Sequence, residues 1–270
     1  MIRINCDEQW KSLREKAKPL RGVIPRITAY GDAPNLTPYG EAYPDGLVDP
    51  KDYKDVIQHC HDEQIFPVYH QHASWAPTGF RWNQNGLGYC WTWGGTGGVM
   101  DCRAREGKPT VLLAPVSMGY LVGWKNRGNY LESFVEGAMN HGIAPAEYVP
   151  NQHSPNPKNF KAGWEEAALN FRIAEAWDTD VRNMIQHAIS ILRTGTPGYI
   201  AYNWWGHALS VVGVKWDESQ VNNLIWLLRN SHDENDIIEM TGNRAVPDEF
   251  IGIRATENIF DREMENVLAV

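Results

Sequence analysis

The sequence predicts an α+β protein whose two lobes meet at a cleft. Helical periodicity dominates the first two thirds of the chain, and short runs rich in Val, Ile and aromatic residues follow from residue 198 onward. Helices that precede strands in this way are typical of α+β folds. With 270 residues, of which 43% are hydrophobic, the chain is long enough for one large domain with a sizeable core.

Helices are expected first along the chain. Residues 1–66 carry two helix candidates separated by a loop at 30–50, and the second is the better signalled, because Asp49 supplies a cap and Pro50 suits the first helical position. A third helix begins at Cys90. Its interior glycines each cost about 1 kcal/mol relative to alanine, so we expect close packing against a neighbour to hold it. These glycines are Gly94, Gly95, Gly97 and Gly98.

Three further helices and then four strands follow. The helices are expected at residues 129–142, 164–177 and 181–192, the first opened by a capping-box pattern from Asn129 to Glu132 and stopped at Gly142. Strands are expected at residues 198–204, 207–216, 224–230 and 250–255, because these runs are apolar and aromatic and are separated by polar turns.

Charge and composition exclude several classes of function. Asp and Glu number 33 against 25 Lys and Arg, a net charge of −8, so a nucleic-acid partner is not expected. No apolar run reaches the roughly 20 residues of a membrane span. Residues 1–7 lack the apolar region of a secretory signal, and the four cysteines are unevenly spaced. We therefore expect a reducing compartment, with a cytoplasmic or virion-associated protein that is not secreted through a signal peptide.

Neither a cofactor nor a metal site is expected. The triplets His59-Cys60-His61 and His70-Gln71-His72 contain good zinc ligands but lack the spacing of a zinc motif. We interpret them as part of a solvated, partly packed surface. The glycines after Cys90 resemble a phosphate loop, but no Lys follows them and no strand precedes them.

Four residues supply the parts of a cysteine-based acyl transfer. Cys90 opens a helix, where backbone N–H groups and the helix dipole lower a thiol pKa. His207 opens a strand and would deprotonate the thiol, and Asn230, at the end of the next strand, would orient the imidazole. Gln84 would add a side-chain N–H to the backbone N–H of Cys90 as an oxyanion hole.

The context of these residues resembles the papain-like cysteine peptidase family. Gln84-Asn85-Gly86-Leu87-Gly88-Tyr89-Cys90-Trp91 is similar to the family's nucleophile motif, His207-Ala208-Leu209-Ser210-Val211-Val212-Gly213 to its histidine strand, and Trp226-Leu227-Leu228-Arg229-Asn230-Ser231 to its asparagine motif. All motifs stand in family order, from about Pro67 to Ala255. The resemblance implies a helical lobe whose nucleophile helix packs against an antiparallel β lobe. It also implies a peptide or protein substrate, whose backbone would pair with Gly128 and Asn129. Trp91 and Trp205 stand close to the proposed site in the sequence and are further candidates for substrate contact, although tryptophans more commonly fill cores.

The chain departs from the family pattern at several points. His232 stands where a Trp usually shields the histidine–asparagine contact, and only four residues separate the Tyr199 strand from His207. Residues 1–66 lie where the family keeps a propeptide but show no propeptide signature. We interpret them as a permanent N-terminal extension that packs on the core or covers the cleft, with residues 67–270 as the papain-like two-lobed domain.

Two functions remain open at this stage. The first is a thiol hydrolase that cleaves a peptide or isopeptide bond through a Cys90 acyl-enzyme. The alternative is a weakly active or inactive papain-fold component that serves in structure or assembly with protein partners, for example in a virus particle. A cleft blocked by the N-terminal extension would favour the second function, and an open cleft with Cys90 facing His207 would favour the first.

Overall fold

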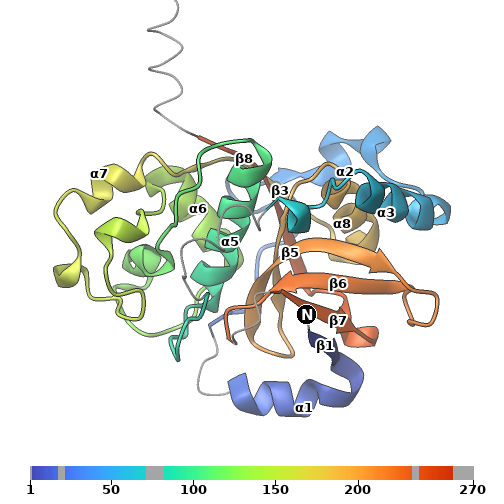
Figure 1. The fold of residues 1–270 in the computed structure, drawn as a ribbon, viewed down its shortest axis with the longest axis horizontal. Helices are drawn as coiled ribbons and strands as arrows, with labels where there is room; N and C mark the ends of the chain where they lie inside the picture. Colours follow the sequence, from blue (N-terminus) through green and yellow to red (C-terminus); the bar gives the residue numbers. More distant parts are fainter. Residues whose placement is uncertain (1, 18–21, 71–81, 233–236, 258–270) are drawn as a thin grey trace, which may run out of the picture.

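The computed structural model describes residues 2–17, 22–70, 82–232 and 237–257 (Figure 1). Within these ranges the strands form an eight-stranded open sheet in the order β1-β7-β6-β5-β4-β8-β3-β2. Pairings from β7 to β3 are antiparallel, and the two edge strands, β1 and β2, are each parallel to their neighbour. The strands are β1 (Ile2–Asn5), β2 (Thr37–Pro38), β3 (Ile173–Asp178), β4 (Gly198–Tyr202), β5 (His207–Trp216), β6 (Leu224–Arg229), β7 (Ile237–Thr241) and β8 (Glu249–Thr256).

Helices pack on both faces of the central strands. They are α1 (Cys6–Ala17), α2 (Tyr39–Ala42), α3 (Tyr53–Asp62), α5 (Cys90–Arg105), α6 (Leu131–His141), α7 (Trp164–Ala168) and α8 (Met184–Leu192). Strand β4 shows the division, because Tyr199 and Ala201 join the core shared with α5 and α6, whereas Ile200 and Tyr202 join the core shared with α3 and α8. Alternate residues of a strand point to opposite faces, so a strand buried on both faces reads as a continuous apolar run.

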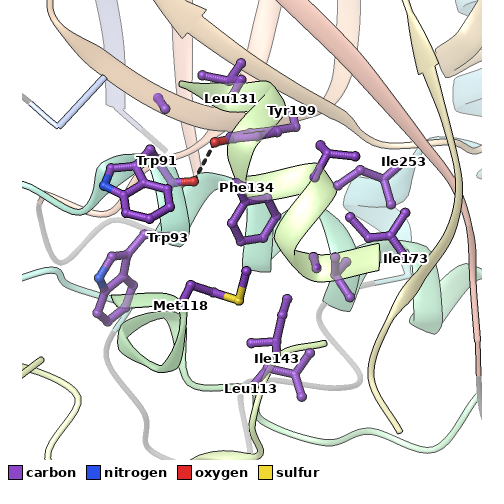
Figure 2. Close-up of a cluster of buried hydrophobic side chains, with 14 of the residues drawn as sticks. Trp91, Trp93, Leu113, Met118, Leu131, Phe134, Ile143, Ile173, Tyr199 and Ile253 are labelled. Carbon is purple, nitrogen blue, oxygen red and sulfur yellow. Dashed lines mark hydrogen bonds between the residues drawn. The ribbon is translucent and has the colours of Figure 1, made fainter. Parts of the chain in front are cut away.

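Helix α5 lies between the helical part of the molecule, with α6 and α7, and the sheet (Figure 1). Its glycines permit this position: a Cβ on Gly94 would lie 2.9 Å from the backbone nitrogen of Leu209 in β5, and one on Gly95 would overlap the ring of Phe134 in α6. The predicted close packing of the glycine-rich helix is therefore confirmed. Figure 2 shows the core beside it, where the Tyr199 hydroxyl donates to the carbonyl of Trp91 at 2.5 Å.

The structure corrects three sequence-based expectations. The helix expected over 164–177 ends at Ala168, and residues 173–178 form β3, because pairing with β8 outweighs the helix propensity of its alanines and glutamate. Helix α6 begins at Leu131 with Tyr130 as its N-cap and no side-chain cap, so the capping box is wrong. The sequence analysis also missed β1, β2 and β7. The other expected helices and strands are confirmed within a few residues.

The N-terminal extension reaches both edges of the sheet. Strand β1 adds to one edge through Ile2–Asn5, which pair with Ile238–Thr241 of β7. Strand β2 adds to the other edge, where Thr37 and Pro38 pair with the end of β3. Residues 22–31 lie between these two strands in the chain, and we call them the covering segment. The extension is thus built into the sheet on both sides of the covering segment.

Other features bear on compartment and metal binding. In the described ranges no helix is long and apolar enough to cross a bilayer. All four cysteines are free thiols and buried. His61 uses both ring nitrogens for protein contacts, with the Tyr69 hydroxyl at 2.6 Å and the Val214 carbonyl at 2.8 Å, and Cys60 is a core residue. This triplet is partly packed, because Cys60 and His61 make these contacts while His59 is exposed. Gln71 and His72, in the second triplet, lie outside the described residues.

Candidate functional site

Cys90 and His207 come from two elements that pack directly against each other. Cys90 is the first residue of α5 and is fully buried. Its Sγ lies 3.9 Å from the carbonyl oxygen of Gly206, the residue before His207. Ser210 of β5 fixes this contact between helix and strand, because its hydroxyl donates to the Gly94 carbonyl at 2.6 Å. The fold therefore places the predicted nucleophile at the start of the strand that carries the predicted base.

His207 and Asn230 are joined as the sequence predicts. The Nε2 atom of His207 lies 3.0 Å from Oδ1 of Asn230, at the end of β6. An amide oxygen only accepts hydrogen bonds, so Nε2 must carry the proton, and Nδ1 keeps its lone pair while the ring is neutral. Nδ1 is buried and has no hydrogen-bond partner among the described residues, and the Cys90 thiol is not bonded to it in this state. This tautomer leaves a proton acceptor available to a thiol.

Two aromatic rings shield the His207–Asn230 contact from water. The His232 ring meets the His207 ring edge-on at 4.0 Å between centroids, and the Trp205 ring lies 4.5 Å away at a steep angle. The backbone N–H of His232 also donates to Asn230 Oδ1 at 3.3 Å. His232 therefore occupies the place expected for the missing Trp, and Trp205 packs on the imidazole.

Gln84 is held in place by hydrogen bonds to Ser231 and Leu87, and its carbonyl accepts the Leu87 N–H at 3.1 Å. Its backbone N–H donates to the Ser231 carbonyl at 2.8 Å, and its side-chain oxygen accepts from the Ser231 hydroxyl at 2.6 Å. Its Nε2 donates one hydrogen to the Leu87 carbonyl at 2.5 Å. A side-chain amide has two N–H hydrogens, so one remains for a further acceptor. An oxyanion-hole role for Gln84 stays a prediction.

The covering segment lies directly on Cys90. A Cβ added to Gly22 would lie 2.6 Å from Cys90 Sγ and 2.8 Å from the Cys90 backbone nitrogen. Asn129 pairs with the same segment: its N–H donates to the Gly22 carbonyl at 3.1 Å, and its carbonyl accepts from Ile24 at 3.0 Å. Val23 and Asn129 form a parallel bridge. The backbone that is expected to bind a substrate thus binds residues of the same chain.

The two tryptophans predicted to contact substrate differ in position. Trp91 is 0% exposed and belongs to the core, and its indole N–H donates to the Arg127 carbonyl at 3.2 Å. Its side chain therefore packs inside the helical lobe and does not line the cleft. Trp205 is 4% exposed and lies against His207. Gly128 and Asn129 are partly exposed.

Burial keeps both reactive groups neutral in this closed state. Loss of hydration raises the pKa of the Cys90 thiol to about 12, despite backbone N–H groups aimed at the sulfur. Burial, reinforced by the neighbouring His232, lowers the pKa of His207 well below its ordinary value. The thiolate–imidazolium pair expected from the sequence is therefore not favoured in this closed state. Its formation requires that water reach both groups, and hence that the covering segment be displaced.

The sequence analysis missed a set of acidic residues that contact the covering segment. Asp178 ends β3, Glu132 lies in the first turn of α6, and Glu249 opens β8. All three meet Arg26 or its neighbours. No sequence pattern predicts that these carboxylates lie close together, because they come from three elements, and more than 40 residues separate each carboxylate from the next along the chain.

Glu249 gives the stability of the protein a specific pH dependence. Its carboxylate accepts the backbone N–H of Arg26 at 2.9 Å, and burial raises its pKa from 4.5 to about 7. The pKa of Glu249 is thus higher in the folded than in the unfolded protein. The protonated side chain therefore contributes its full stabilisation below about pH 4.5, and this contribution is lost as the pH rises to about 7. Glu249→Gln cannot ionise at this position. At pH 8 we therefore expect the unfolding free energy of the variant to exceed that of wild type by about 1–3 kcal/mol.

The measurement is chemical denaturation of both proteins at pH 4.5 and at pH 8. The two should be equally stable at pH 4.5, where wild-type Glu249 is protonated. Glu218→Gln is the matched control, because Glu218 is exposed and its contacts, with Lys54 at 2.7 Å and the Trp216 indole N–H at 3.4 Å, lie at the surface. An equal difference between Glu249→Gln and wild type at both pH values would contradict the argument.

Comparison with solved structures identifies proteins whose fold is similar to this one. No protein-family model matches the chain, and no curated protein matches its sequence. Xylellain, a cysteine protease from Xylella fastidiosa, aligns with a TM-score of 0.52 at 17% identity, over 67% of this chain and 83% of its own. Bromelain from Ananas comosus aligns with a TM-score of 0.50 at 14% identity, over 66% and 98%.

A larger share of the chain aligns with a digestive procathepsin L2 from the larval midgut of Tenebrio molitor. That alignment has a TM-score of 0.57 at 12% identity and covers 90% of this chain and 80% of the other. Residues 67–270 make up about three quarters of the chain, so the match includes part of the N-terminal extension. At this identity the agreement concerns the fold: the chain has the papain-like fold of the cysteine proteases.

Proposed function

We propose that this chain is a thiol hydrolase that cleaves peptide or isopeptide bonds through Cys90, and that the covering segment closes its site in the state described above. The observation that carries the proposal is the His207–Asn230 hydrogen bond of 3.0 Å, which fixes the tautomer with Nδ1 free to accept a proton. A buried ring nitrogen without a partner is uncommon in a structural histidine. At the start of the strand that contacts a thiol, it is what general-base catalysis needs.

In the proposed reaction, His207 Nδ1 takes the thiol proton of Cys90 and the thiolate adds to the substrate carbonyl carbon. The oxyanion accepts hydrogen bonds from the Cys90 N–H and the second N–H of Gln84. The imidazolium gives its proton to the leaving amine, and the thioester remains on Cys90. Water, deprotonated by His207, then hydrolyses the thioester and releases the acid, and the thiol regains its proton.

The closed site is the observation that favours a second function. Cys90 is 0% exposed, and Gly22 occupies the space in front of its sulfur and backbone nitrogen. A papain-fold protein that acts only through binding or assembly would need no access to the thiol. On this alternative the covering segment is a permanent part of the fold and never leaves the cleft.

The pH dependence of Cys90 alkylation decides between the two functions. Iodoacetamide is applied to Gly22→Ala, whose added methyl group is expected to favour the open state, and the modified residue is located by mass spectrometry. For a hydrolase, Cys90 should react with a midpoint at least about one pH unit below the ordinary thiol pKa of 8.5. His207→Ala in the same background should return the midpoint to the ordinary range.

Cys102 serves as an internal control, because it is also a buried cysteine on α5 but has no histidine beside it. A Cys90 midpoint that is unchanged by His207→Ala would favour the binding or assembly function. Hydrolysis of a fluorogenic peptide mixture by Gly22→Ala, lost in Gly22→Ala Cys90→Ala, would then establish turnover.

A further inference from the structure

The covering segment places a guanidinium in a site made for one. Arg26 binds Asp178 in a bidentate arrangement, with Nη1 2.5 Å from Oδ1 and Nη2 2.8 Å from Oδ2. The Asp178 side chain is 0% exposed and that of Arg26 is 15% exposed. Two parallel N–H···O bonds from a planar fork are the strong, direction-specific form of an ion pair.

Two more carboxylates surround the same arginine. Glu132 lies 3.5 Å from Arg26 Nε, and the Thr28 hydroxyl bridges them, accepting from Nε at 2.9 Å and donating to the Glu132 carboxylate. Glu249 accepts the backbone N–H of Arg26. The cluster therefore holds the main chain and the side chain of one basic residue at the same time.

Beside Arg26 the cluster continues into a cavity of about 580 Å³. Among its lining residues, carboxylates outnumber cations, and one of the two cations, Arg182, is already paired with Asp180 at 2.7 Å. The charged residues in its lining are Glu41, Asp180, Asp248, Glu249, Arg26 and Arg182. The space available to a longer ligand at this site is thus also acidic.

Opening the site removes the cation from this cluster. Gly22 and Arg26 belong to one segment, so a substrate can reach Cys90 only if Gly22 leaves, and Arg26 is four residues away. Asp178 would keep its hydrogen bonds from the Thr179 N–H at 2.9 Å but lose Arg26, its ion-pair partner in the described residues. A buried carboxylate without a cation is strongly unfavourable. A guanidinium supplied by the substrate would restore this ion pair.

We infer that the open cleft selects peptides with an arginine side chain on the acyl side of the scissile bond, which takes the place of Arg26 at Asp178 and Glu132. The inference rests on the proposed function, of which it names the substrate class. Arginine is favoured over lysine because the bidentate contact matches a planar guanidinium, whereas an ammonium offers a single point of charge. The covering segment thus carries the side chain that the substrate would supply.

A binding experiment tests the guanidinium site without any catalysis. Arg26→Gln in the full chain vacates the site of the guanidinium and keeps a shorter, uncharged polar side chain. Methylguanidinium at millimolar concentration should raise its melting temperature by about 2–4 °C, and methylurea, which has the same shape without charge, should not. Wild type, whose site is filled, and Arg26→Gln Asp178→Asn should not respond. An equal response to methylurea, or an equal response in the double variant, would overturn the inference.

A kinetic experiment then tests the selectivity. Peptides with arginine, lysine, citrulline or leucine at each of three positions on the acyl side are offered to Gly22→Ala. At one position, kcat/KM for arginine should exceed that for the uncharged isostere citrulline by about 30-fold, and Asp178→Asn should reduce the ratio to about 3-fold or less.

The two experiments separate the two possible failures. If all peptides are cleaved with equal kcat/KM, the proposed arginine selectivity is wrong, but the proposed hydrolase activity is supported. If no peptide is cleaved and Cys90 shows no His207-dependent alkylation, the hydrolase fails, and the methylguanidinium result alone decides whether the acidic cluster is a guanidinium site.

Discussion

Replacing Gly22 by alanine is expected to raise the rate of Cys90 alkylation by about 10- to 100-fold. The added Cβ would lie 2.6 Å from Cys90 Sγ and 2.6 Å from the Gly88 carbonyl oxygen, closer than real Cβ contacts. One of these neighbours belongs to the backbone and cannot rotate away. Forcing a methyl group into a packed site costs about 1–3 kcal/mol, and each 1.4 kcal/mol multiplies the open population tenfold. The alkylation rate of a buried thiol follows that population.

Ile27→Ala is the matched control for this variant. Ile27 lies in the same covering segment but is 80% exposed, so its truncation should leave the alkylation rate of Cys90 within about twofold of wild type. The rates are measured by mass spectrometry under native conditions, with the far-ultraviolet circular dichroism of each protein recorded beforehand. An unchanged rate in Gly22→Ala, or an equal rise in Ile27→Ala, would contradict the closed geometry.

The second large effect is expected at the ion pair that joins the helix of Cys90 to the strand of Asn230. Asp101 in α5 accepts from Arg229 in β6 at 3.0 Å, and the two side chains are 0% and 2% exposed. Breaking this buried ion pair in Asp101→Ala should lower the unfolding free energy by about 3–5 kcal/mol. Arg229 directly precedes Asn230, whose Oδ1 lies 3.0 Å from His207 Nε2.

Equilibrium denaturation of Asp101→Ala measures the loss. Glu218→Ala breaks an ion pair at the surface, where both side chains are more than half exposed, and should cost less than about 1 kcal/mol. Replacing both members of the buried pair, with Asp101→Ala and Arg229→Met, should recover part of the stability, because neither member's charge is then buried. If Asp101→Ala lowered the unfolding free energy by no more than the surface control does, the buried pair would not contribute the expected stability.

The predicted site residues were accessible from the sequence because each stands at the end of a regular element. Cys90 opens α5, His207 opens β5 and Asn230 follows β6, and short-range patterns fix such ends. Helix caps, glycines and apolar runs are local signals. The prediction for Gln84 rests on its place in the motif before Cys90, and the sequence does not predict its hydrogen bonds to Ser231.

What the sequence could not supply depends on contacts between residues far apart in the chain. The pairing of Arg26 with Asp178 joins positions 152 apart, and neither residue stands in a motif. The short strands β1 and β2 have no pattern of their own and exist because a sheet edge is available to them. For the same reason, residues 173–178, with two alanines and a glutamate, read as helix until β8 is placed beside them.

The pairing of β1 with β7 sets an order of events during synthesis. Residues 2–5 are synthesised before their partners, residues 238–241, which follow more than 230 residues later. The partners of the covering segment at Asn129 and Asp178, and the strand β3 that pairs with β2, are all made before β7. Contacts of such long sequence separation slow folding, since loop closure must precede them. We therefore expect the docking of β1 on β7 to follow the contacts with Asn129 and Asp178 that hold the covering segment over Cys90.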